Sequence, residues 1–190
     1  MTTQLKERPV VFTTEEVNAV LAGNKTQHRL VVGNPSNGFE FDFNLSGLTT
    51  PAIGHMDNKF GLLTKREIHP NSNKFERGVE PCPFGKVGDR FIAKEPYYGS
   101  FNNEHIATHS RSILLEITDI RIERVQDTSH ADAVAEGVHH FDIEARLRDQ
   151  PLSAAQIVFS RYWDTRHQDG FENWESNPWV WVIEFKKVDE

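Results

Sequence analysis

The sequence is poor in cysteine and in long apolar stretches. Cys82 is its single cysteine, so an intramolecular disulfide and a cysteine-rich zinc site are both excluded. The longest uninterrupted apolar run, Trp179 to Ile183, has five residues, whereas a helix needs about 20 to span a bilayer. The first residues hold no apolar core of the kind found in a signal peptide. We therefore expect a protein of a reducing, cytoplasmic compartment with no membrane partner.

Positive charge is also scarce. The chain has 21 Lys and Arg residues and 28 Asp and Glu residues, which gives a net charge of −7 over 190 residues. Non-specific coating of nucleic acid requires clustered cations that neutralise phosphates, so this class of protein is excluded, whereas a local basic site is not. The 13 Phe, 4 Trp and 3 Tyr residues are too many for a disordered chain. The length predicts a single domain over residues 1–190.

Local patterns predict regular elements on both sides of an irregular middle. Strands are predicted at 9–13, 30–32, 91–94, 112–125 and 179–188, and helices at 13–23, 129–137 and 153–166. The first two predicted helices begin at a Thr or Ser of the kind that caps helices and end at Gly, and the third is predicted to be amphipathic. The order of elements and the absence of repeats favour an α+β fold with a small curved or closed sheet.

Residues 33–88 differ in composition from the rest. They contain eight of the 12 glycines and five of the nine prolines, which predicts a long irregular insertion. Within it, Phe39, Phe41, Phe43 and Leu45 alternate with polar residues, as in a half-buried strand, and 59–68 is its predicted partner. The pair would form either a hairpin lid or a surface insertion that packs on the main sheet.

The densest polar cluster is GNKTQHR, from Gly23 to Arg29. It places two cations, a hydroxyl and an imidazole at the turn between a predicted helix and a predicted strand. A partly desolvated Lys loses basicity and can act as a general base, whereas Thr or His can act as nucleophile, base or hydrogen-bond donor. The alternative interpretation is a solvated polar turn.

Glu136 is the second candidate, because it ends a short, otherwise apolar helix. A carboxylate is disfavoured there by the helix dipole, so it is either exposed to solvent or held for a partner such as a Lys. Arg90 and Glu95 flank the predicted strand at 91–94. Both are candidates for binding, although Arg90 could equally fix a turn.

Other polar and aromatic residues are assigned no chemistry. His105 and His109 have the spacing of a helical metal-binding pair, but no HExxH motif surrounds them, and we expect neither a metal nor another cofactor. We expect Trp174, Trp179 and Trp181 to be packing residues rather than a platform for stacking bases.

Four blocks of sequence, taken together, resemble the ASCH domain family of the PUA-like superfamily, and most closely its members of about 200 residues encoded by phages and prophages. The blocks are PVVFTTEEVNAVLAGNKTQHR at 9–29, CPFGKVGDRFIAKEPY at 82–97, ITDIRIERVQDTSHADAVAEGV at 117–138, and FSRYWDTR followed by NPWVWVIEFKKV near the end. The resemblance implies a PUA-like small β-barrel with flanking helices, a long irregular insertion, and a cleft lined by the Gly-x-Lys-x-x-x-Arg turn.

The resemblance also implies an activity. Similar short bacterial ASCH proteins are amidohydrolases that remove the acetyl group from N4-acetylcytidine with a Lys, a Thr three residues later and a Glu on a following helix. Lys25 and Glu136 match two of these residues, and His28 occupies the Thr position. We therefore hypothesise that Lys25 deprotonates a water or the Thr26 hydroxyl, that His28 shares this proton, and that Glu136 protonates the leaving amine.

The same hypothesis assigns substrate binding to three further residues. Arg29 and Arg90 would hold a phosphate or an oxyanion, with Glu95 beside them. The expected ligand is a nucleoside or single-stranded RNA. Alternatives within the family and superfamily are a ribonuclease, a non-catalytic module that binds RNA or a modified base, and a phage accessory protein that engages a host protein.

Overall fold

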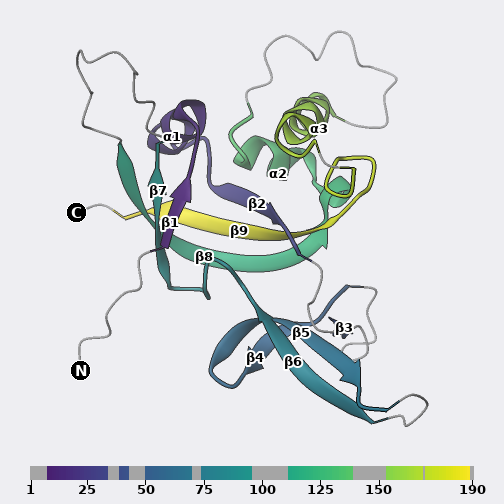
Figure 1. Ribbon diagram of the computed structural model, residues 1–190. Helices are drawn as coiled ribbons and strands as arrows, with labels where there is room; N and C mark the ends of the chain where they lie inside the picture. Colours follow the sequence, from purple (N-terminus) through teal and green to yellow (C-terminus); the bar gives the residue numbers. More distant parts are fainter. Residues whose placement is uncertain are drawn as a thin grey trace, which may run out of the picture.

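The computed structural model describes residues 8–33, 39–42, 50–69, 74–95, 111–138, 153–168 and 170–188. Its main feature is a mixed five-stranded sheet in the order β1-β7-β8-β9-β2. These strands are β1 (Arg8–Val11), β7 (Arg90–Lys94), β8 (Ser112–Arg124), β9 (Trp179–Lys187) and β2 (Gln27–Val31). Strands β1 and β7 run parallel, and all other neighbours in this sheet are antiparallel. The sheet curls into a half-barrel, in line with the barrel-like shape expected from the sequence (Figure 1).

Strand β8 bends in the middle because of a β-bulge. Its register against β9 shifts between Ile117 and Asp119, so one residue is inserted and the alternation of the two faces is reversed. The buried apolar positions are accordingly odd-numbered up to Ile117 and even-numbered from Ile120 to Ile122. This reversal keeps both halves of the curled strand in contact with the core.

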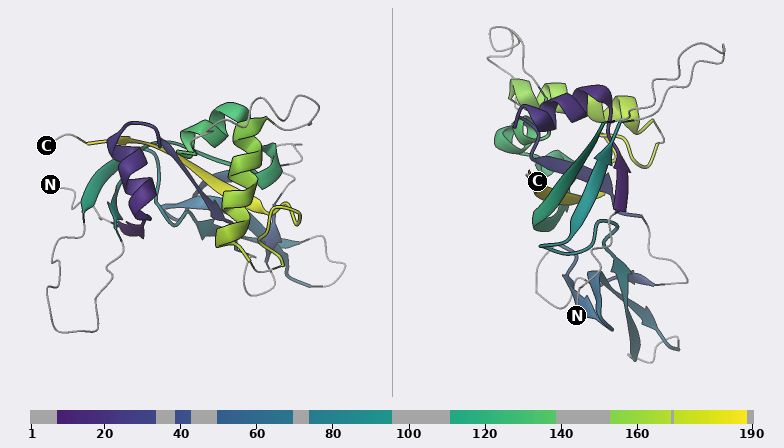
Figure 2. Two further views of the ribbon diagram at one scale, coloured as in Figure 1. Left: turned by 90° about the horizontal axis from the view of Figure 1, so that it is seen from above. Right: turned by 90° about the vertical axis from the view of Figure 1, so that its left-hand side faces the viewer.

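The described residues contain three α-helices, which lie in the upper part of the molecule in Figure 1; Figure 2 shows them at the opposite end from the strands at 53–67 and 75–81. They are α1 (Thr14–Leu21), α2 (His130–Ala135) and α3 (Ala154–Arg166). Each begins with a capping box, formed by Thr13 for α1, Ser129 for α2 and Ser153 for α3. Gly23 and Gly137 adopt positive φ angles just after α1 and α2. The helices, their caps and the strands that the sequence predicted outside 33–88 are thus confirmed.

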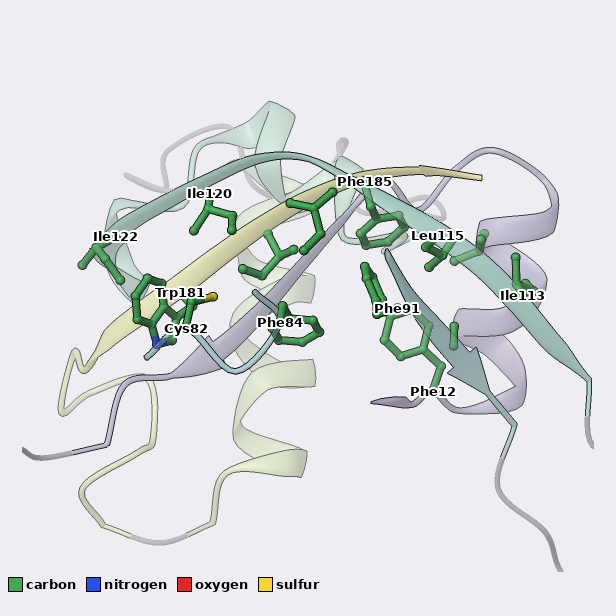
Figure 3. Close-up of a cluster of buried hydrophobic side chains, with 14 of the residues drawn as sticks. Phe12, Cys82, Phe84, Phe91, Ile113, Leu115, Ile120, Ile122, Trp181 and Phe185 are labelled. Carbon is green, nitrogen blue, oxygen red and sulfur yellow. The ribbon is translucent and has the colours of Figure 1, made fainter. Parts of the chain in front are cut away.

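Strand β9 explains the longest apolar run of the sequence. Its residues Trp181, Ile183 and Phe185 belong to one buried cluster, shown in Figure 3 together with Phe91, whereas Val180 and Val182 belong to a second cluster beneath α3. A strand buried on both faces needs apolar residues at consecutive positions.

No helix within the described ranges is long and apolar enough to cross a membrane.

Residues 33–88 are more regular than the sequence indicated. Their described part contains an antiparallel sheet of β3 (Glu40–Phe41), β4 (Ile53–Met56), β5 (Lys59–Glu67) and β6 (Phe75–Pro81). The predicted pairing of 39–45 with 59–68 is confirmed where it is described, because Phe41 pairs with Thr64; positions 43–45 lie outside the described residues. The irregularity expected here was therefore wrong for β4 and β6, which the sequence did not indicate.

The turn between β4 and β5 shows why composition was misleading. Asp57 and Asn58 have φ values of 50° and 62°, the left-handed pair that a type I′ hairpin turn requires and that Asp and Asn tolerate best. The polar pair Asp57-Asn58 therefore marks a tight turn, whereas Gly54, Gly61 and Gly78 lie within strands.

Candidate active site

The turn after α1 is joined by its backbone to the end of α2. Lys25 and Glu136 form an isolated antiparallel β-bridge, and the Thr26 N–H donates to the carbonyl oxygen of Ala135 at 2.8 Å. Gly137 allows this approach: its φ is +85°, and a Cβ at this position would lie 3.0 Å from the Cβ atoms of Ala19 and Lys25. The pairing predicted between Lys25 and Glu136 is thus fixed by the main chain.

The ammonium group of Lys25 is buried between two carboxylates. Lys25 is 1% exposed. Its Nζ donates to Oε2 of Glu136 at 2.9 Å and to the Glu136 carbonyl oxygen at 3.0 Å, and it lies 3.5 Å from Oε1 of Glu16. A buried cation is tolerated only with such partners, because desolvation costs several kcal/mol.

Arg29 binds the other oxygen of Glu136. Its Nη1 lies 2.9 Å from Oε1 of Glu136, and its Nη2 forms an ion pair with Glu123. Burial by itself raises the pKa of Glu136, but the charges of Lys25 and Arg29 outweigh burial and lower this pKa to about 2. Glu136 is therefore a carboxylate at neutral pH. The Nε of Arg29 is buried and has no hydrogen-bond partner among the described residues.

His28 is a neutral imidazole beside the same carboxylates. Its ring lies against Phe12, with a centroid separation of 4.9 Å, and its Nδ1 is 4.0 Å from Oε1 of Glu16. Burial, and next the charge of Lys25, lower the pKa of His28 to about 4. At pH 7 the ring therefore has a free nitrogen lone pair that can accept a proton.

Glu16 is the residue of this cluster that the sequence did not reveal. Its Oε2 accepts hydrogen bonds from the Thr13 N–H at 2.9 Å and from Arg166 at 3.2 Å, while its Oε1 faces Lys25. Burial raises its pKa, but Lys25 and other nearby groups lower it overall. The Thr-x-x-Glu pattern explains Glu16 as a helix cap, so no separate signal marked it as part of a site.

These groups surround a small cavity that α3 closes. Its volume is about 20 Å³, roughly the space of one water molecule. Its lining includes Glu16, His28, Arg29 and Glu136 on one side and Tyr162 and Arg166 of α3 on the other. Lys25 is not among the lining residues, but it contacts Glu16 and Glu136, which are. The polar chemistry available to a molecule in the cavity is thus that of His28, Arg29 and the carboxylates.

Three predicted site residues are not brought into this cluster. Thr26 is exposed and does not line the cavity. Arg90 pairs with Glu116 at 3.4 Å, between β7 and β8. Glu95 accepts a hydrogen bond from the Thr14 hydroxyl at 2.6 Å and pairs with Arg111.

No group of three or more His, Cys, Asp and Glu side chains within the described ranges could hold a metal ion. His105 and His109, the helical pair considered from the sequence, lie outside the described residues.

Comparison with known proteins gives one structural similarity. No protein-family model and no curated protein matches the chain. Among solved structures, the chain is similar to an ASCH domain from Lactobacillus crispatus JV V101, with 14% identity, 95% of this chain and 78% of that chain covered, and a TM-score of 0.37. At this identity and TM-score, the similarity establishes neither family membership nor activity.

Proposed function

We propose that this chain is an ASCH-type amidohydrolase that cleaves the N4-acyl amide of a modified cytidine. One observation carries the proposal: the neutral imidazole of His28 and the guanidinium of Arg29, whose buried Nε has no partner among the described residues, line one cavity with two carboxylates. A proton acceptor and a hydrogen-bond donor are the two groups that hydrolysis of an amide requires. The resemblance of the sequence to ASCH proteins supplies the substrate class.

The first step of the proposed reaction is the attack of water. His28 accepts a proton from a water molecule while the water oxygen bonds to the acyl carbon and the carbonyl electrons move to the oxygen. Glu16, whose Oε1 is 4.0 Å from His28 Nδ1, stabilises the resulting imidazolium, and the Nε–H of Arg29, which has no partner among the described residues, stabilises the oxyanion. This arrangement assigns base and oxyanion donor to two adjacent residues of β2.

The second step expels the amine. The C–N bond breaks as the oxyanion collapses, and the imidazolium of His28 gives its proton to the leaving N4 nitrogen, so a carboxylic acid and an unmodified cytosine ring are formed. Lys25 is a positioning residue in this scheme, because it holds Glu136 and Glu16 in place. Glu136 is ionised at neutral pH, so it does not protonate the leaving group as the sequence had suggested.

Entry of the substrate requires a change in α3. A cavity of about 20 Å³ admits a water molecule but not an acyl group. Arg166 of α3 is held to Glu16 at 3.2 Å, and Tyr162 lines the same side. In the proposed cycle α3 moves away as the acyl group enters and returns after its release, as active-site lids do.

The test is direct detection of products. Purified protein is incubated with N4-acetylcytidine, and with a short RNA that contains it, and cytidine and acetate are measured by mass spectrometry. The proposal expects both products from at least one substrate. It is contradicted if neither substrate is consumed.

A second candidate function is binding without turnover. The ammonium of Lys25 makes two hydrogen bonds and one further ion pair, so it already has protein acceptors for its N–H groups, which favours a structural role in a pocket for a modified base. Such a module would show a ligand-dependent rise in melting temperature with no product. Ribonuclease activity, and a phage accessory role with a host protein, are proposals that rest on the resemblance alone.

A further inference from the structure

A second, larger cavity lies at the opposite end of β2 from His28. Its volume is about 290 Å³, close to the lower limit of about 300 Å³ for small-molecule sites. It is formed where β2 and β8 end, where β9 begins, and by the turn at 170–178. Phe41, Arg124, Phe171, Glu172 and Trp179 are the large or charged residues of its lining.

Arg124 is the cation of this cavity. Its guanidinium carbon lies 4.1 Å from the centroid of the Trp179 ring, and its Nη1 donates to the carbonyl oxygen of Asn177 at 2.9 Å. Arg29 and Arg121 have carboxylate partners, whereas no described carboxylate lies within ion-pair distance of Arg124. A stacked guanidinium with remaining N–H donors is suited to a planar ligand that carries hydrogen-bond acceptors.

Phe171 adds an aromatic face at the entrance. Its side chain is 91% exposed, unusual for a large apolar residue. The turn that carries it is held to α3 just after Phe171: the Trp163 indole N–H donates to the Glu172 carbonyl oxygen at 2.7 Å, and the Trp174 N–H donates to Oδ1 of Asp164 at 2.7 Å. The phenyl ring is thus presented on a hydrogen-bonded turn.

We propose that this cavity binds one nucleotide through its base. The base would stack against Phe171 and the layer formed by Trp179 and Arg124, and Arg124 would donate to the acceptors of the base or its phosphate. Glu172 would accept from an exocyclic amino group, and its charge disfavours a bare anion such as inorganic phosphate. Trp179, which the sequence indicated as a packing residue, thus also lines a ligand site.

The nucleotide class rests on the proposed function, in which the substrate is a modified cytidine, but the site itself is separate. Trp163 lines the first cavity, and its indole N–H binds the backbone of Glu172 in the second. The two cavities are therefore linked by the hydrogen bond between Trp163 of α3 and Glu172. A nucleotide in the second cavity would be held next to the helix that closes the first.

The experiment measures the affinity of the full chain for two probes. Fluorescein-labelled pentacytidylate is titrated by fluorescence anisotropy, and cytidine 5′-monophosphate by calorimetry. Phe171→Ala and Arg124→Gln are each expected to weaken binding about tenfold, the usual size of one lost base stack. Phe75→Ala is the matched control, because Phe75 is an exposed phenylalanine, 47% accessible, on β6, and it should bind like the unaltered chain.

The outcomes separate the sources of the nucleotide. Weakening with both probes indicates a free nucleotide or a strand end, and weakening with pentacytidylate alone indicates an internal nucleotide of a strand; either result supports the site. The site is overturned if both variants bind with unaltered affinity, or if the unaltered chain binds neither probe. Either of these results is expected if the cavity contacts a protein instead. Failure of N4-acetylcytidine hydrolysis would leave these affinities untouched, so the two proposals can fail separately.

Discussion

The Nζ of Lys25 lies 2.9 Å from Oε2 of Glu136, although 111 positions separate these residues in the chain. The two also share a backbone bridge, so the ion pair is set by main-chain geometry rather than by the reach of flexible side chains. Arg29 and Glu16 complete a buried cluster around it. This cluster can be tested with variants and with changes of pH.

The first prediction concerns the charge balance of the cluster. Lys25→Met leaves the buried carboxylates without their shared cation and should lower the free energy of unfolding by about 3 kcal/mol. The double variant Lys25→Met/Glu136→Gln removes one of those charges and should recover at least about 1 kcal/mol. Urea unfolding at pH 7 measures both. A single variant as stable as the unaltered chain would show that the pair is not buried as described.

Gly137→Ala tests the close approach of α2 to Lys25. The substitution introduces strain at a φ of +85° and a Cβ 3.0 Å from that of Lys25, and together these should cost about 2 to 3 kcal/mol. Gly88→Ala is the matched control, because Gly88 has a φ of +86° and nothing within 4 Å of the added Cβ. Thermal unfolding should show the larger loss for Gly137→Ala. Equal losses would exclude a steric contribution from Lys25.

Most elements outside residues 33–88 were predictable because local signals agree with the fold. Thr13 and Ser129 cap helices in sequence and in structure, and Gly137 ends α2 at a positive φ. Strands β4 and β6 of the second sheet were missed because β4 is short and β6 is interrupted by Gly78, and because the Asp57-Asn58 turn resembles loop composition. Strands of this kind depend on pairing partners, which a local pattern does not contain.

The candidate site was predictable only in part. Lys25, His28 and Arg29 were found because they cluster in sequence, and Glu136 because a carboxylate at a helix C-terminus is unfavourable. Glu16 was not predicted, because the capping box that it forms with Thr13 already explains it. The separation of Arg90 from the cluster depends on its pairing with Glu116, a contact between strands that the sequence does not specify.

Stability should depend on pH through His28 and Glu136. The pKa of His28 falls from 6.5 to about 4 on folding, so the unfolded chain binds the proton more tightly, and the stability present above pH 6.5 is lost as the pH falls toward 4. The pKa of Glu136 falls from 4.5 to about 2, which adds a further loss below pH 4.5. Urea unfolding between pH 4 and pH 8 should therefore show declining stability below about pH 6.5.

An NMR titration of the folded protein isolates the contribution of His28. Its ring protons should shift with a midpoint near pH 4, and His28→Gln should flatten the decline in stability between pH 6.5 and pH 4. A native midpoint near pH 6.5 would contradict the burial of this ring beside Lys25.

Arg29→Lys tests the role of the guanidinium. A lysine cannot bridge Glu136 and Glu123 with a flat fork of donors, so the loss should be about 2 to 4 kcal/mol. Arg111→Lys is the matched control, because Arg111 is an exposed arginine paired with Glu95, and it should cost much less stability than Arg29→Lys. Similar losses in urea unfolding would mean that the Arg29 contacts contribute no more than a surface pair.

The proposed role of His28 is tested by hydrolysis of N4-acetylcytidine with three proteins at equal concentration: the unaltered chain, His28→Gln and Thr26→Val. Circular dichroism first establishes that each is folded. We expect the unaltered chain and Thr26→Val to release cytidine, whereas His28→Gln should be at least about 100-fold slower because it lacks the general base. Equal rates for His28→Gln and the unaltered chain, or no cytidine from any of the three, would contradict this role.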